Sequence, residues 1–133
     1  MRIFDERQKL MQVIQEKRYK LKRFIAIQHS YNGNTENIHA HTIAINCSIR
    51  TDTEDVIDYR KGEDVIQKCI DKYENKYLND LPEFQENATI ERLGEVLCFE
   101  IDDALKEINY EMDRFEIGET PLRVYVITNE LRD

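Results

Sequence analysis

Two stretches in the first third of the chain alternate between apolar and polar residues, as β-strands with one buried face do. In residues 20–28 one parity consists of Leu21, Arg23, Ile25 and Ile27, and His29 continues it. In residues 39–47 one parity consists of His39, His41, Ile43, Ile45 and Cys47. Between them, Asn32-Gly33-Asn34 is typical of a turn. We therefore predict two antiparallel strands joined by a loop.

The rest of the pattern predicts two amphipathic helices and two further strands. Apolar residues recur at helical spacing in residues 60–77 and in 89–109, where Thr89 is the expected N-cap. Apolar runs at 56–59 and 122–127 predict short strands, whereas the charged residues 111–120 are expected to be irregular. The chain is thus predicted to be an α+β domain with a four-stranded antiparallel sheet and two helices on one face.

Residues 1–18 carry acidic residues early and basic residues late, which favours an extra N-terminal helix, with a partly ordered leader as the alternative. We therefore divide the chain of 133 residues into a helical extension, 1–18, and a single domain, 19–133. The formal net charge of −8 argues against nucleic acid or an anionic membrane as the main partner. Without a signal peptide or a membrane-spanning run, a cytoplasmic protein is expected, and its three cysteines are interpreted as core thiols.

All three histidines of the chain fall within the predicted strand–loop–strand unit. His39 and His41 are two residues apart and project to the same side of their strand, and an antiparallel pairing brings His29 beside them. Three neutral imidazoles form a common catalytic zinc site that leaves one position for water or substrate. Half-buried histidines without a metal are the alternative, but their clustering leads us to predict zinc on His29, His39 and His41.

Several short motifs follow one another in a specific order: His29, His39-Ala40-His41, Val56-Ile57-Asp58-Tyr59, residues 73–80, Ala88-Thr89-Ile90-Glu91, and residues 122–129. This series resembles the family of 6-pyruvoyl-tetrahydropterin synthase and 6-carboxytetrahydropterin synthase. The second motif resembles the family's His-Gly-His, and the fifth resembles its pro-thr-x-glu helix start. The last segment is similar to the family's final strand, which ends in glu-thr.

The resemblance implies a tunnelling fold, in which the sheets of neighbouring subunits join edge to edge in a homohexamer of two stacked trimers. It implies active sites between subunits, each with zinc on three histidines beside a pterin pocket. The implied substrate is a small pterin, dihydroneopterin triphosphate. The implied substrate-binding residues are Thr89 and Glu91, together with Thr128, which aligns with the family's pterin-anchoring glutamate, or Glu130, two residues further on.

The chain departs from the family at the residues that move protons. Thr35 stands at the position of the catalytic cysteine, and Glu74 and Asn75 stand at the positions of an aspartate–histidine pair. Neither a threonine nor an asparagine exchanges a proton near neutral pH. Some divergent members of the family use a glutamate near the cysteine position as their base, so the resemblance implies Glu36, assisted by Glu74, as the proton acceptor. A solvated loop carboxylate is the alternative for Glu36. The sequence thus predicts a zinc-dependent carbon–oxygen lyase with altered catalytic residues. A non-catalytic zinc- and pterin-binding relative, or different chemistry on the same fold, is the alternative.

Overall fold

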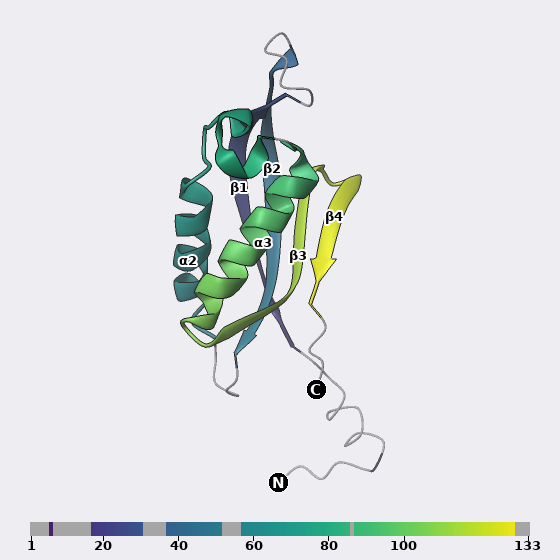
Figure 1. The fold of residues 1–133 in the computed structure, drawn as a ribbon. Coiled ribbons are helices and arrows are strands. Elements are labelled where there is room, and N and C mark those ends of the chain that lie inside the picture. Colours follow the sequence, from purple (N-terminus) through teal and green to yellow (C-terminus); the bar gives the residue numbers. More distant parts are fainter. Residues whose placement is uncertain (1–5, 7–16, 31–36, 52–56, 86, 130–133) are drawn as a thin grey trace.

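A computed structural model of the chain describes residues 6, 17–30, 37–51, 57–85 and 87–129. Within these residues, four strands form one antiparallel sheet in the order β1-β2-β3-β4. They are β1 (Tyr19–His29), β2 (His39–Thr51), β3 (Tyr110–Thr120) and β4 (Arg123–Thr128). The helices are α2 (Tyr59–Asp71) and α3 (Ile90–Lys106), with 3-10 turns η2 (Leu78–Asp80) and η3 (Pro82–Phe84) between them. Both α-helices cover the same face of the sheet (Figure 1).

The predicted α+β class, with four antiparallel strands and two helices on one face, is confirmed, but two elements were predicted wrongly. No strand forms at Ile57 to Tyr59, because the Asp58 side chain accepts a hydrogen bond from the Arg60 backbone N–H and caps α2 instead. The segment 111–120, expected to be irregular, lies within β3. The extra N-terminal helix predicted over residues 1–18 lies outside the described residues, apart from Glu6, Lys17 and Arg18.

Strand β3 contains an irregularity that hides its pattern in the sequence. Ser48 pairs with Arg114 whereas Ile49 pairs with Met112, so Asp113 is an extra residue in β3. The buried positions consequently change parity, from Tyr110 and Met112 before the irregularity to Phe115 and Ile117 after it. A simple alternation is therefore absent over the whole strand, although each half has one.

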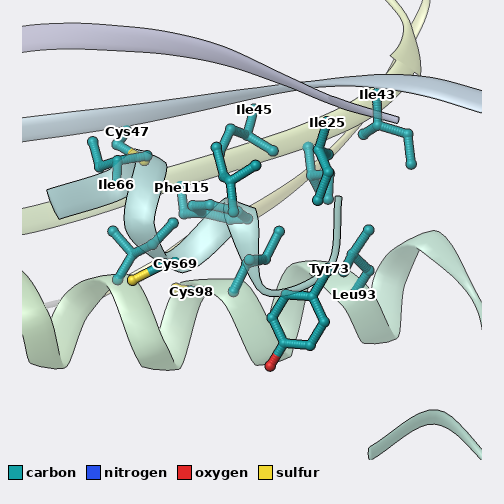
Figure 2. Close-up of a cluster of buried hydrophobic side chains, with 14 of the residues drawn as sticks. Ile25, Ile43, Ile45, Cys47, Ile66, Cys69, Tyr73, Leu93, Cys98 and Phe115 are labelled. Carbon is teal, nitrogen blue, oxygen red and sulfur yellow. The ribbon is translucent and has the colours of Figure 1, made fainter. Parts of the chain in front are cut away.

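The core lies between the helices and the face of the sheet that they cover. Figure 2 shows part of it, with Ile25, Ile43, Ile45 and Phe115 of the sheet together with Leu93, Cys98 and Tyr73. The three cysteines are free thiols buried in this core, as predicted. Burial raises the pKa of the Cys98 thiol to about 11 and raises the pKa values of the Cys47 and Cys69 thiols as well. No helix in the described part of the chain is long and apolar enough to cross a bilayer.

On the uncovered face of the sheet, Glu116 lies between two cations. Its Oε1 accepts a hydrogen bond of 2.9 Å from Arg114 Nε and lies 3.0 Å from Lys20 Nζ. The hydrogen bond from Arg114, together with Lys20, lowers the pKa of the Glu116 carboxyl below its ordinary value of 4.5. The ionised form is thus favoured in the folded state.

This lowered pKa makes part of the stability depend on pH. A carboxylate with a lower pKa in the folded than in the unfolded chain adds stability above the unfolded-state pKa, and this is lost as the pH falls through the folded-state pKa. We expect Glu116→Gln to reduce the free energy of unfolding at neutral pH, with the difference shrinking below about pH 4. Urea unfolding of the wild type and the variant between neutral pH and below about pH 4 measures this difference, with Glu95→Gln on α3 as the control. A difference that does not vary with pH would contradict the prediction.

Candidate functional site

Three strand ends bring two histidines and a carboxylate together on the helix-covered side of the sheet. The antiparallel register pairs His29 of β1 with His39 of β2 and Ile27 with His41. Within the described residues, one possible ligand atom from each of His29, His41 and Glu119 lies within 4.8 Å of the others. Imidazole nitrogen and carboxylate oxygen are both ligands of zinc, so this group could hold a metal ion.

His29 is completely buried, and its ring is fixed by the backbone. Its Nδ1 lies 2.6 Å from the carbonyl oxygen of Ala88, the residue before the N-cap of α3, Thr89. Because a carbonyl only accepts, Nδ1 carries the proton, and Nε2 of the neutral ring carries the lone pair. Nε2 is therefore the atom of His29 that is suited to bind a metal.

The two ring nitrogens of His41 have different surroundings. Nδ1 lies 3.6 Å from Oε2 of Glu119, whereas Nε2 is buried and has no hydrogen-bond partner among the described residues. An unsatisfied buried polar atom costs about 1–3 kcal/mol. A metal ion bound at Nε2 would remove this cost, so the residues present fit the metal that the sequence predicted.

His39 is exposed and lies further out. Its ring centroid is 5.9 Å from that of His29 and 6.0 Å from that of His41, whereas the centroids of His29 and His41 are 5.0 Å apart. His39 is not part of the group whose ligand atoms lie within 4.8 Å. All three imidazoles thus gather at one end of the sheet, and the role of His39 as a metal ligand stays a prediction.

The segment before η2 holds the edge of β1 next to the histidines. Oε2 of Glu74 accepts a 2.9 Å hydrogen bond from the Ala26 backbone N–H, and the Asn75 backbone N–H donates to the Ala26 carbonyl at 2.7 Å. Asn75 adopts a positive φ of 60°, which asparagine tolerates better than most residues. Glu74, predicted to assist catalysis, thus directs its carboxylate to the backbone of β1.

The residue after His29 is held in the same way. The Asn79 side chain accepts a hydrogen bond from the Ser30 backbone N–H and donates one to the Ser30 carbonyl, both of 2.8 Å. An amide side chain paired with both backbone groups of one residue acts as an additional strand partner. The motif of residues 73–80 therefore fixes the end of β1 and, with it, the position of His29.

A cavity of about 350 Å³ lies between the start of α3 and the β3–β4 turn, and Glu91, Glu119, Arg123 and Tyr125 are among its lining residues. This volume is in the range of small-molecule sites. Glu91, predicted to bind substrate, therefore faces a cavity, and Glu119 belongs to both the cavity and the candidate metal group. Thr89 was also predicted to bind substrate. Its hydroxyl accepts a hydrogen bond from the Arg92 backbone N–H and thereby caps the N-terminus of α3.

Other predicted site residues lie elsewhere. Thr128 pairs with Arg114, which pairs with Ser48, so Thr128 is about seven residues along the sheet from His41, roughly 23 Å. Thr35, Glu36 and Glu130 lie outside the described residues.

Glu119 is the site residue that the sequence analysis missed. The Glu119-Thr120 pair ends β3, and glu-thr is the ending of the family strand that residues 122–129 were expected to match. This pair could have identified Glu119 from the sequence. It was overlooked because residues 111–120 were expected to be irregular and not to form a strand.

Comparison with protein families gives a match over nearly the whole chain. The model of the 6-pyruvoyl tetrahydropterin synthase family matches residues 12–130. No curated protein matches the chain in a sequence search.

Several solved structures share the fold of this chain at low sequence identity. The 6-pyruvoyl tetrahydropterin synthase of Caenorhabditis elegans has 12% identity and a TM-score of 0.68, over 86% of this chain and 96% of its own. An uncharacterised protein from Wolinella succinogenes has 12% identity and a TM-score of 0.63, over 86% and 100%. The Plasmodium falciparum 6-pyruvoyl tetrahydropterin synthase has 15% identity and a TM-score of 0.56, over 87% and 100%.

Proposed function

The chain belongs to the 6-pyruvoyl tetrahydropterin synthase family, and from this we propose that it is a zinc-dependent protein acting on a pterin triphosphate or a related heterocycle, with altered catalytic residues. One observation carries the proposal. His29, His41 and Glu119 converge on a possible metal position, and Glu119 also lines a cavity of small-molecule size. A metal beside such a cavity is the usual arrangement of a metal-dependent small-molecule site.

The proposed zinc would be held by His29 through Nε2, by His41 and by His39, with Glu119 beside them. When bound, the metal supplies Lewis-acid chemistry that polarises substrate oxygens and lowers the pKa of a hydroxyl. The hydrogen bond from His29 Nδ1 to the Ala88 carbonyl fixes the ring orientation that such a ligand needs. Glu91 and Glu119 line the cavity and offer carboxylates to the N–H groups of a heterocycle.

The proposed proton acceptor is Glu36, because Thr35 and Asn75 replace the family's proton-moving groups. In the Plasmodium vivax 6-pyruvoyltetrahydropterin synthase, a glutamate is a catalytic residue, which supports a carboxylate in this role. Glu74, the second candidate, holds Ala26 through its carboxylate. Because this hydrogen bond engages the Glu74 carboxylate with the backbone of β1, Glu74 is the weaker candidate, and we propose Glu36 as the base.

A non-catalytic binding protein is the second candidate function, and the 74–75 segment favours it. Glu74 and Asn75 stand where the resemblance expects a proton-moving pair, and here their hydrogen bonds hold the backbone of β1. A site that keeps the metal and the cavity but uses its relay positions for structure would bind without turnover. Only the chemistry separates the two functions, since the fold is common to both.

We further propose a homo-oligomer, with a hexamer as the expected form. β4 pairs only with β3, so its other edge has no strand partner within the described sheet. It also exposes apolar side chains, with Val124 at 43% and Val126 at 38% exposure, and Leu122 beside it is 92% exposed. An exposed apolar edge strand favours association with another chain.

The metal proposal predicts one zinc ion per chain in protein purified without added metal, measured by elemental analysis. The double variant His39→Ala, His41→Ala is expected to lose the zinc, because only the imidazole of His29 remains. Each single variant then shows whether His39 contributes as His41 does. Asn46→Ala, elsewhere on β2, is the control. Full zinc occupancy in the double variant would refute the site.

The catalytic proposal predicts little or no conversion of dihydroneopterin triphosphate to 6-pyruvoyl- or 6-carboxytetrahydropterin by the zinc-loaded protein. Any residual rate should fall about a hundredfold to ten-thousandfold in Glu36→Gln, as is typical for loss of a general base. Glu74→Gln is the matched comparison. Turnover at rates typical of the family, unchanged in both variants, would show that the base is misassigned.

The assembly proposal predicts that light scattering at micromolar concentration gives the mass of a hexamer. Val124→Lys with Val126→Lys should weaken the association, because charged residues on an edge strand oppose pairing. Lys61→Glu on α2, away from that edge, is the control. A monomeric wild-type protein would contradict the proposal.

A further inference from the structure

We infer that Glu119 is a positioning residue of the metal centre: its carboxylate accepts the Nδ1 proton of His41 and thereby makes Nε2 the metal ligand. This inference rests on the proposed metal site and assigns Glu119 a task within it. The two groups face each other, with 3.6 Å between His41 Nδ1 and Glu119 Oε2. A small side-chain adjustment brings this distance into the hydrogen-bond range of about 2.7–3.2 Å.

The surroundings of the two nitrogens favour this tautomer. A neutral imidazole carries its proton on one nitrogen and a lone pair on the other. With the proton on Nε2, the donor would be buried without an acceptor in the described residues, and Nδ1 would direct its lone pair toward a carboxylate. With the proton on Nδ1, the carboxylate has a donor to accept from, and the lone pair of Nε2 is available for a metal. The second arrangement gives Nδ1 an acceptor, and it would satisfy Nε2 as well once a metal is bound.

His29 shows the same arrangement with a different acceptor. Its Nδ1 bonds to the carbonyl of Ala88 at 2.6 Å, which directs the Nε2 lone pair inward. Histidines that bind metals almost always donate their second N–H to a carboxylate, a carbonyl or water. The two histidines of the candidate group would thus each have an acceptor of their own, a backbone carbonyl before α3 and a carboxylate at the end of β3.

The shape of the β3–β4 turn explains how Glu119 reaches this place. A Cβ built on Gly118 would lie 2.6 Å from the Arg123 carbonyl oxygen, so the two strands approach closely there. The pairing of β3 with β4 shifts between Ile117 and Thr120, which places Glu119 within the irregularity. Its side chain is one-third exposed, so a substitution there removes the carboxylate without opening the core.

Direct metal binding by Glu119 is the competing reading, and zinc affinity separates the two. We would titrate zinc against a competing chelator in the wild type, Glu119→Ala, Glu119→Gln and the control Glu91→Ala, which removes another carboxylate from the same cavity. The alanine variant is expected to bind zinc about 10–100-fold more weakly. The glutamine variant should retain most of the affinity, because its side-chain carbonyl still accepts the Nδ1 proton, and Glu91→Ala should match the wild type.

The tautomer of His41 provides a readout that does not depend on metal. Nitrogen-15 NMR of the metal-free wild type should show the proton on Nδ1, and Glu119→Ala should move it to Nε2. If Glu119→Gln binds zinc as weakly as Glu119→Ala and also changes the absorption spectrum of the cobalt-substituted protein, Glu119 is a direct ligand and the inference fails. Unchanged affinity and tautomer in Glu119→Ala overturn it as well. A wild type that binds no zinc refutes the proposed metal site. The tautomer of His41 in the metal-free protein then still tests the contact between His41 and Glu119.

Discussion

The structure depends on the register between β1 and β2, which runs unbroken from Tyr19↔Ile49 to His29↔His39. Because side chains alternate between faces, a slip of one residue would turn every buried isoleucine of one strand to solvent. The same slip would separate His29 from His41. The core and the candidate metal centre are therefore set by one pairing, and the hydrophobic energy of the isoleucines holds the histidines in place.

Much of this could be predicted from the sequence, because β1, β2 and both helices have clear periods, and the cap at Thr89 has a recognisable residue type. β3 could not be predicted, since its extra residue, Asp113, breaks the alternation of apolar and polar residues and its polar positions carry many charges. Because β3 was not predicted, Glu119 was not predicted either, since its approach to His41 depends on that strand. Local patterns thus gave the two histidines but not the carboxylate from a distant segment.

The 73–80 segment shows that residues at corresponding positions of a motif need not have the same role. The sequence identifies Glu74 and Asn75 as candidates for proton transfer by their place in a motif. In the structure they bond to Ala26, while Asn79 bonds to Ser30, so the segment serves as a partial edge strand for β1. What the motif retains is the support of His29, and the chemistry at these positions has to be established separately from the fold.

The hydrogen bond between His29 and Ala88 has a consequence for how the site can change. A backbone carbonyl is present whatever residue occupies position 88, so no single substitution there deletes this acceptor. The acceptor beside His41 is a side chain, which one substitution at position 119 removes. In the candidate metal centre, the acceptor of His29 is therefore insensitive to substitution, whereas the acceptor of His41 is not. Differences in metal affinity among related chains should accordingly accumulate on the His41 side.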